Sequence, residues 1–361
     1  MTPRSPPATP PAPAAGPAPE LPPESAPDAI DPAVATARLR IVIVNYRTPG
    51  LTIDCLASLR PELDALPNAR VLVVEGGSGD DSADRLRDAI EANRWADRVT
   101  LDVRETNAGF AGGNNAALRA VLDEEPAVGY VLLLNPDTVV RPGAVVELLR
   151  FMEEHPAAGL AGSRLEDPDG TPQNSAFRFP SVAGNFENGL RFGPVSRLLR
   201  RCVVAPPAAD AAHRTGWLAG ASLMVRREVF DAVGLLDDRY FMYFEETDFC
   251  LAAERAGFEA WYVPTSRVIH LVGAASGVTA KNESARPAKR RPAYWFESRR
   301  RYHLKNHGPL TAAAADAAWL LGLGLWRLRV RLCRLPDRDP EKLWLDSLRH
   351  SVFARGFRLN A

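Results

Sequence analysis

The amino-acid sequence predicts an α/β fold in which a mostly parallel sheet is flanked by helices. Short apolar runs that end in polar or glycine-rich turns alternate with helix-like segments, a pattern typical of βαβ units. The run from Val131 to Leu134 is continuous and apolar, as buried parallel strands are. Pro136 ends this run, because proline cannot donate a hydrogen bond to a sheet. A buried parallel sheet therefore organises the chain.

The other elements follow from the same signals. Thr48 and Pro49 form a helix start, in which a capping residue precedes proline at the first helical position. A second helix is expected after the glycine-rich stretch 107–115, and a third at 226–233, where Gly234 ends it. The expected strands, besides the run at 130–134, are 39–44, 71–74, 99–103 and 216–225.

Three regions are predicted along the 361 residues. Residues 1–37 contain 12 of the 31 prolines and almost no large apolar side chains. Such a segment cannot bury enough surface to offset its ordering entropy, so we expect a disordered Pro/Ala-rich tail, with a proline-rich docking segment as the alternative. Residues 38–280 form the predicted globular domain, and residues 281–361 form a basic, helical C-terminal extension.

Composition excludes several classes of protein. The formal net charge is zero, which argues against a general polyanion binder, and we expect no nucleic-acid partner. The four cysteines are far apart and form no CxxC pair, as expected for reduced thiols in the cytoplasm. The N-terminal residues lack a basic stretch followed by an apolar one, so we expect no secretory signal.

The polar ends of the predicted strands converge on one edge of the sheet, where open α/β sheets bind ligands. Glycines allow close approach of the backbone, and helix N-termini favour phosphate, so a nucleotide cleft is expected there. The GxGxxG fingerprint is absent from the first turn, 45–51, and the GxxxxGK[ST] loop is absent from the whole sequence. This disfavours a nicotinamide dehydrogenase and a P-loop NTPase.

Residues 39 to about 275 resemble an inverting family 2 glycosyltransferase of the GT-A (Rossmann-like) fold, closest to the bacterial rhamnosyltransferase-like branch. The matching segments are IVIVNYRT (41–48), VVEGGSGDDS (73–82), NAGFAGGNNAAL (107–118), LLLNPDT (132–138), the long block 216–257 and VIHLVGAAS (268–276). The resemblance implies transfer of a sugar from a nucleoside-diphosphate sugar to a hydroxyl of a cell-envelope glycan or a lipid-linked acceptor.

The resemblance also assigns residues to the donor. Glu75 stands where the family usually has an aspartate that contacts the nucleobase, and Gly76 where it usually has asparagine. Asn135 and Asp137 belong to an NPD form of the metal-binding motif, and His270 resembles a third metal ligand. The implied donor-binding residues are Asn45, Tyr46, Arg47, Glu75, Asn107, Gly109, Phe110, Asn114, Asn135 and Asp137.

The implied cofactor is a divalent metal, Mg²⁺ or Mn²⁺, bound by Asp137 and His270. One aspartate is a weak site for a hard cation, so diphosphate and water oxygens would complete the shell. From the sequence pattern alone, Asp137 could equally cap a following helix. His270 could equally be a structural, hydrogen-bonded histidine.

The acceptor side is expected in the block 216–257, with Trp217, Gly220 and Ala221 as sugar-binding residues. Glu245, Glu246 and Asp248 are three carboxylates within four residues and have aromatic neighbours. Both features raise a carboxylate pKa and make a better base. The resemblance makes Glu246 the first candidate for the catalytic base and Asp248 the second. An acidic helix N-terminus without catalytic role remains the alternative.

Residues 281–305 carry nine basic and two acidic residues with interleaved aromatics. We expect residues 281–334 to contact an anionic membrane surface or a lipid-linked acceptor, which would make the protein peripheral on the inner face of the plasma membrane. A solvated basic face is the alternative. Ala312–Trp326 is apolar but shorter than a spanning helix, so it would lie on the membrane, on a partner, or in the core. Two other functions stay open: a non-catalytic sugar-nucleotide or glycan-binding relative, and a nucleotidyltransferase.

Overall fold

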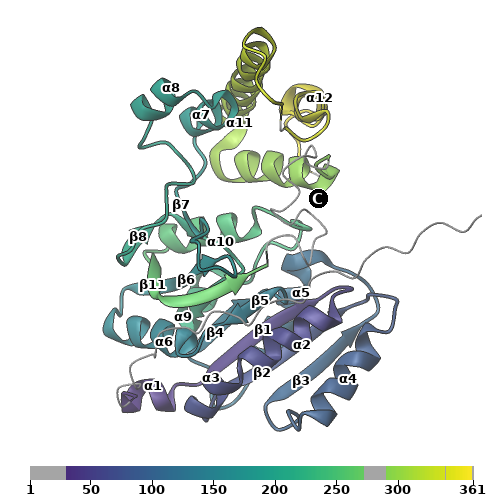
Figure 1. The fold of residues 1–361 in the computed structure, drawn as a ribbon, viewed down its shortest axis with the longest axis vertical. Coiled ribbons are helices and arrows are strands. Elements are labelled where there is room, and N and C mark those ends of the chain that lie inside the picture. Colours follow the sequence, from purple (N-terminus) through teal and green to yellow (C-terminus); the bar gives the residue numbers. More distant parts are fainter. Residues whose placement is uncertain (1–29, 272–289, 338, 360–361) are drawn as a thin grey trace, which may run out of the picture. The chain divides into compact units, whose positions relative to one another are not determined.

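The computed structural model describes residues 30–271, 290–337 and 339–359. Its main element is a nine-stranded sheet with the order β3-β2-β1-β4-β10-β6-β11-β5, in which β8 also pairs with β11 (Figure 1). Asp31–Ala361 form one compact unit. The predicted boundary at residue 280 lies outside the described residues.

The first half of the sheet is parallel, as predicted from the sequence. Its strands are β1 (Leu39–Asn45), β2 (Arg70–Gly76), β3 (Val99–Arg104) and β4 (Tyr130–Leu134). β1 lies between β2 and β4, and Asn45 is in register with Glu75. Every residue of β4 is buried, which explains its continuous apolar sequence.

The second half of the sheet is mixed. β10 (Ser222–Arg226) runs antiparallel between β4 and β6 (Ala158–Glu166). β11 (Glu259–His270) is parallel to β6 and antiparallel to both β5 (Thr138–Val140) and β8 (His213–Thr215). The strand predicted at 216–225 is two strands, because β9 (Trp217–Leu218) leaves to pair with β7 (Ala176–Phe177).

Helices pack against the sheet and bury a continuous apolar core between them. The predicted helix starts and stops at Pro49 and Gly234 are confirmed, although the Thr48 side chain makes no capping hydrogen bond. These helices are α2 (Pro49–Ser58), α3 (Arg60–Ala65), α4 (Ser82–Ala92), α5 (Gly109–Leu122), α6 (Ala144–Glu154), α9 (Arg227–Val233) and α10 (Glu245–Arg255).

A short helix, α1 (Pro32–Thr36), lies inside the segment 1–37 that was predicted to be disordered. The side chain of Asp31 accepts a hydrogen bond from the amide of Ala33 at 2.7 Å, and Val34 is buried. The buried Val34 side chain and the Asp31 cap therefore stabilise a helix within the last part of the segment that was predicted to be disordered. Residues 1–29 lie outside the described part.

The C-terminal helices are α11 (Ala293–Leu332), α12 (Leu343–Arg349) and α13 (Val352–Arg355). They group with α7 (Val182–Leu190) and α8 (Gly193–Leu198) (Figure 1). α11 is two helices joined at Gly308, whose φ is 78°. By length and composition α11 could cross a membrane, unlike the shorter segment predicted from the sequence, but 33% of its apolar window is buried.

Candidate active site

The ends of β1 and β2 carry Asn45 and Glu75, two of the predicted donor-binding residues. Both are buried and stabilise their own loops. Asn45 Oδ1 accepts a hydrogen bond from Thr52 Oγ1 at 2.9 Å. Glu75 accepts hydrogen bonds from the amides of Gly77 at 3.1 Å and Ser78 at 3.0 Å, and from the Ser78 hydroxyl. The Glu75 carboxylate therefore shapes the loop that follows β2.

Arg47 connects this loop to the loop that follows β1. Its amide donates to Ser78 Oγ at 2.8 Å, and its Nε donates to the Ser78 carbonyl at 3.0 Å. The guanidinium lies 5.2 Å from the centroid of the exposed Tyr46 ring. The two predicted donor loops thus form one hydrogen-bonded unit with an aromatic ring on its surface.

The glycine-rich stretch starts helix α5 at Gly109, earlier than predicted. Asn107 Oδ1 accepts a hydrogen bond from the Gly109 amide at 2.8 Å, and Asn114 Nδ2 donates to the Phe110 carbonyl at 2.9 Å. Asn115 was not assigned a role from the sequence. It anchors Leu236 with both side-chain atoms, at 2.7 and 3.2 Å.

An open cleft of about 690 Å³ lies beside the ends of β1, β2 and β3 and the start of α5. Asn107 and Gly109 line it, together with Gly76, Gly112 and Gly113. The glycines leave room for a ligand to approach the backbone. This cleft has the place and the size expected of a nucleotide site at the edge of an α/β sheet.

Asp137 lies in the turn between β4 and β5, where it meets the end of β11. Its Oδ1 is 3.5 Å from His270 Nε2, and its carbonyl accepts a hydrogen bond from the Leu271 amide at 2.9 Å. A strand follows Asp137, so the alternative that it caps a helix is wrong. The sheet brings the two predicted metal ligands together across 133 residues of sequence.

These side chains fit a divalent cation. Asn135 Oδ1 is buried and accepts no hydrogen bond from any residue in the described part of the chain. One carboxylate, one imidazole and one amide oxygen are ligands that Mg²⁺ or Mn²⁺ accepts when diphosphate oxygens complete the shell. Among the described residues, no group of three or more His, Cys, Asp or Glu side chains is placed to hold a metal.

The block 219–221 joins the metal turn to α10. The Asn135 amide donates to the Ala221 carbonyl at 3.0 Å. Gly220 packs between two predicted site residues, since a Cβ atom there would lie 3.0 Å from Phe110 Cζ and 3.9 Å from Glu246 Cβ. Trp217 stacks on Phe177 at 4.1 Å and donates to the Arg178 carbonyl at 3.0 Å. The absence of a side chain at Gly220 thus allows Phe110 and Glu246, which were predicted for the donor and acceptor sides, to approach each other.

The three carboxylates at the start of α10 have different surroundings. Glu245 is buried, and Glu246 lines a cavity. Asp248 accepts hydrogen bonds from Lys305 Nζ at 2.6 Å, Asn306 Nδ2 at 2.6 Å and Tyr240 OH at 3.2 Å. The structure therefore engages Asp248 in an ion pair with α11, whereas Glu246 faces open space.

The backbone before α10 is strained. Tyr243 and Phe244 have φ values of 71° and 69°, the left-handed region that side chains other than glycine rarely adopt. The Ser298 hydroxyl donates to the Met242 carbonyl at 3.0 Å, and the Phe244 ring packs 5.6 Å from that of Tyr302. Residues of α11 thus hold the turn that presents Glu246.

Burial raises the pKa of Glu246 to about 7, although the amides of Glu246 and Thr247 offset part of the effect. The pKa of Glu245 is raised well above its usual range, first by burial and then by the charge of Glu246. Glu246 Oε2 has no hydrogen-bond partner in the described part of the chain. A carboxylate with a pKa near neutrality and a free oxygen is suited to accept a proton.

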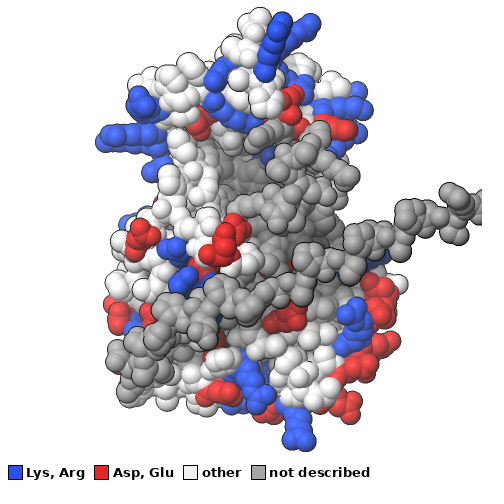
Figure 2. All heavy atoms as spheres, in the orientation of Figure 1, with Lys and Arg blue, Asp and Glu red and all other residues white. Residues whose placement is uncertain are grey.

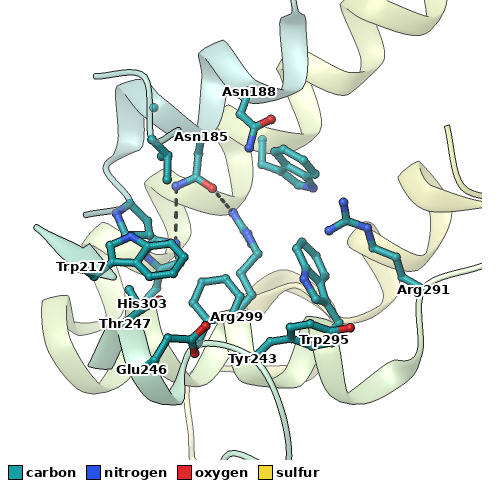
Figure 3. A pocket seen from close by; sticks show the side chains of 15 residues that line it. Asn185, Asn188, Trp217, Tyr243, Glu246, Thr247, Arg291, Trp295, Arg299 and His303 are labelled. Carbon is teal, nitrogen blue, oxygen red and sulfur yellow. Dashed lines mark hydrogen bonds between the residues drawn. The ribbon is translucent and has the colours of Figure 1, made fainter. Parts of the chain in front are cut away.

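The cavity that Glu246 lines has a volume of about 200 Å³ and lies between α7, α10 and α11 (Figure 3). Trp217, Trp295 and Trp319 form apolar walls, and Asn185 and Arg291 add polar groups. Asp137 does not line this cavity, so the described residues do not place the two carboxylates in one enclosed space. Residues 272–289, which include the end of the segment 268–276, lie outside the described part.

Comparison with known proteins decides the family. The model of the family described as glycosyl transferase family 2 matches residues 40–202. The chain is 34% identical over 245 residues to the N-acetylglucosaminyl-diphospho-decaprenol L-rhamnosyltransferase of Mycobacterium tuberculosis, covering 64% of this chain and 75% of that protein. The chain belongs to glycosyl transferase family 2. Among other similar proteins, this family 2 glycosyltransferase is 23% identical over 286 residues to the dTDP-rhamnosyl transferase RfbF of Shigella flexneri, covering 78% and 84% of the two chains.

Solved structures agree on the fold of this glycosyltransferase. The mannosyltransferase PcManGT from Pyrobaculum calidifontis, in complex with GDP-Man and Mn²⁺, superposes with a TM-score of 0.51 at 14% identity, covering 89% of this chain and 84% of that one. At that identity the likeness supports the GT-A fold alone. The family assignment favours glycosyl transfer over the binding-protein and nucleotidyltransferase alternatives.

Proposed function

We propose that this family 2 glycosyltransferase transfers a rhamnosyl group, with inversion, from dTDP-rhamnose to a hydroxyl of a sugar carried on a lipid-linked diphosphate. The activities that name the Mycobacterium tuberculosis and Shigella flexneri relatives support this donor and acceptor. The observation that carries the proposal is Glu246, a carboxylate with a raised pKa and an unpaired oxygen in an aromatic cavity.

The chemistry assigns a role to each side of the site. Glu246 Oε2 takes the proton of the acceptor hydroxyl, whose oxygen then bonds to the anomeric carbon. The bond from that carbon to the diphosphate oxygen breaks on the opposite face, and the nucleoside diphosphate leaves. One such displacement inverts the anomeric centre. The pKa of Glu245 is raised well above its usual range by burial and by the charge of Glu246, so Glu245 gains a proton more readily than an exposed glutamate.

On the donor side, the loops of Arg47 and Glu75 and the start of α5 surround the nucleotide. Asn135, Asp137 and His270 would hold Mg²⁺ or Mn²⁺, which supplies charge neutralisation for the departing diphosphate. The carboxylate, imidazole and amide oxygen that lie at the end of β4 support a divalent cation there.

The C-terminal half of α11 supports attachment to a membrane surface. Leu321, Leu325, Leu328 and Leu332 are exposed and recur at the spacing of one helix face. Arginines neighbour them, at 327, 329, 331 and 334. Figure 2 shows more Lys and Arg than Asp and Glu over the region of α8 and α11. We therefore place the enzyme on the cytoplasmic face of the plasma membrane, bound to anionic lipid.

The activity test is a donor screen with analysis of the product. The purified enzyme is incubated with Mg²⁺ or Mn²⁺, a short-chain N-acetylglucosaminyl-diphospholipid, and dTDP-rhamnose or a UDP- or GDP-sugar. We expect transfer from dTDP-rhamnose and an inverted anomeric linkage by NMR. Transfer from another donor only, or retention of configuration, would contradict the proposal.

Membrane attachment is tested by sedimentation with vesicles that contain anionic lipid. We expect the doubly substituted variant Leu325→Asp/Leu328→Asp to stay in the supernatant. Leu345→Asp, on α12, is the matched control and should sediment like the wild type. Equal sedimentation of all three proteins would remove the membrane assignment.

A further inference from the structure

The cavity beside Glu246 holds an arginine, Arg291, that has no carboxylate partner within hydrogen-bonding or ion-pair distance among the described residues. Burial lowers the pKa of Arg291, and the nearby guanidinium groups of Arg191 and Arg299 lower it further, whereas the charge of Asp339 offsets part of the effect. Asp339 pairs with Arg191, and Asp316 pairs with Arg299. Within residues 30–271, 290–337 and 339–359, Arg291 makes neither an ion pair nor a hydrogen bond, so one positive charge is left over.

The position of Arg291 is fixed by aromatic packing. Its guanidinium lies 4.0 Å from the centroid of the Trp295 ring, a cation–π contact that orients the planar group. Pro292 follows directly and is the N-cap of α11, so the backbone is constrained there. A half-buried guanidinium that is held in place with unused donors is suited to bind a phosphate or a carboxylate.

The rest of the lining suits a sugar ring. His303 is only 2% exposed, and its Nδ1 accepts or donates no hydrogen bond in the described part of the chain. Asn185 Nδ2 lies 3.4 Å from His303 Nε2, and Asn185 Oδ1 accepts a hydrogen bond from Arg299 at 2.8 Å. The tryptophan walls offer flat apolar surfaces, and Asn188 adds a further amide. This mixture of aromatic faces and a few polar groups is what ligand sites in proteins contain.

Figure 3 places Glu246 and Arg291 on opposite sides of the cavity, with Trp295 between them. A sugar ring on Trp295 would thus have one edge towards the carboxylate and the other towards the guanidinium. A phosphate close to Glu246 would be repelled, whereas a phosphate at Arg291 is separated from that charge by the ring.

We propose that this cavity is the acceptor subsite, and that Arg291 binds the phosphate attached to the acceptor sugar while Trp295 packs against the ring. The ligand class is a glycosyl phosphate or diphosphate with a lipid chain. The inference rests on the proposed function and adds to it the residue that makes the enzyme select phosphorylated acceptors. Arg291 comes from the segment just before α11, so this selectivity belongs to the C-terminal extension and not to the sheet.

The test measures binding without donor, so that it does not depend on turnover. Two acceptor analogues carry the same sugar and the same short alkyl chain. In one the two parts are joined by a diphosphate, and in the other by an uncharged ether. Calorimetric titration of the wild type should give about tenfold to hundredfold tighter binding of the diphosphate analogue, as expected for charge-assisted hydrogen bonds. Arg291→Ala should bring the two affinities within about twofold of each other, a residual that reflects only weak long-range electrostatics.

Arg291→Lys should keep part of the preference, because a point charge replaces the planar fork. Arg291→Gln serves if the alanine variant does not fold. Arg60→Ala, an exposed arginine of α3 that lines neither cavity, is the control and should keep the wild-type ratio. In the complete assay, Arg291→Ala should raise the KM for the diphosphate acceptor with little change in kcat.

Three results would overturn the inference: equal wild-type binding of the two analogues or no binding of either, equal losses of both affinities in Arg291→Ala, and competition by dTDP for the same site. Failure of the proposed function would look different. The enzyme would then bind the diphosphate analogue selectively but transfer no sugar from dTDP-rhamnose.

Discussion

The carbonyl oxygen of Phe241 accepts a hydrogen bond from the backbone amide of Phe110 at 2.9 Å. Phe110 belongs to the glycine-rich start of α5, and Phe241 belongs to the turn that presents Glu246. Two segments 131 residues apart are therefore joined main chain to main chain. The donor loop and the proposed base cannot move independently without breaking this bond.

Gly109 should be intolerant of any side chain. Its φ is 72°, and a Cβ atom would lie 2.0 Å from the Phe241 oxygen. Gly109→Ala should lower the free energy of unfolding by about 3 kcal/mol, from backbone strain plus overpacking. It should also reduce transfer at least about tenfold, since misplacing a catalytic group is costly.

Gly143→Ala is the matched control, because Gly143 also has a positive φ but has nothing within 4 Å of its Cβ position. It should cost about 1–2 kcal/mol and leave transfer unchanged. Urea unfolding and initial rates measure both effects. Equal rates in the two variants would show that the Phe110–Phe241 contact does not matter to the site.

Glu246→Gln should reduce kcat about 10²- to 10⁴-fold, the contribution expected of a general base. In the wild type, kcat should rise with pH and level off above about 7, because Glu246 must be ionised to take the proton. Initial rates between pH 5 and 9 measure this profile. A flat profile, or a glutamine variant with wild-type rate, would remove Glu246 from the mechanism.

The free energy of unfolding should change with pH in the direction opposite to kcat, that is, it should fall as the pH rises. Burial raises the pKa of Glu246 from 4.5 to about 7. Between these values the native state holds a proton that the unfolded chain has released, so the free energy of unfolding falls as the pH rises through this interval. Urea unfolding at pH 5 and pH 8 should show a smaller difference in Glu246→Gln. If the stability of the variant differed more between pH 5 and pH 8 than that of the wild type, another titrating group would be responsible for the pH dependence.

Metal removal should weaken donor binding through Asp137 and His270, whose facing atoms are 3.5 Å apart. Thermal stabilisation by dTDP-rhamnose should need Mg²⁺ or Mn²⁺ in the wild type and should be lost with EDTA. Asp137→Ala should abolish the metal effect, and His270→Gln should weaken metal affinity about 10- to 100-fold. Stabilisation of Asp137→Ala that still responds to metal would place the cation elsewhere.

Lys305 should act through the position of α10 and not in chemistry. It bonds Asp248 at 2.6 Å and Asp237 at 2.9 Å. Lys305→Met should lower the free energy of unfolding by about 2 kcal/mol, because it leaves the buried carboxylate of Asp248 without its cation. A double-mutant cycle with Asp248→Asn should show coupling above about 0.5 kcal/mol. Coupling near zero, or a loss of kcat as large as in Glu246→Gln, would contradict this role.

Local signals predicted much of the fold. Apolar runs located β1 to β4, and Pro49 and Gly234 marked helix ends, because these signals act within a few residues. The mixed half of the sheet could not be predicted in this way. The direction of β10 depends on its pairing with β4 and β6, whose paired residues lie 61 or more positions away in the sequence.

The same distinction between local signals and contacts of distant residues holds for the candidate site. Asp137 was expected beside His270, and the structure places them together. Sequence reasoning did not foresee that Glu75 bonds the loop after β2, or that Lys305 and Asn306 occupy Asp248. It also missed the cavity of Arg291 and Trp295, because α7 and α11 contribute its walls from more than 100 residues apart. The signs of it in the sequence were Trp217 and Glu246 on the expected acceptor side and the basic, aromatic segment 281–305.

The carboxylate of Asp316 is shared: one oxygen pairs with Arg299 beneath the cavity, and the other accepts a hydrogen bond from the Val352 amide at 2.8 Å. Asp316 thus connects the last helix, α13, to Arg299 in the cavity lining, and Val352 also packs against Leu304 and Ala312 of α11. Removal of the chain from Val352 onwards would leave that buried carboxylate oxygen without its hydrogen bond and would weaken the support of Arg299. Fluorescent or affinity labels are therefore better fused to the N-terminal side of the sheet.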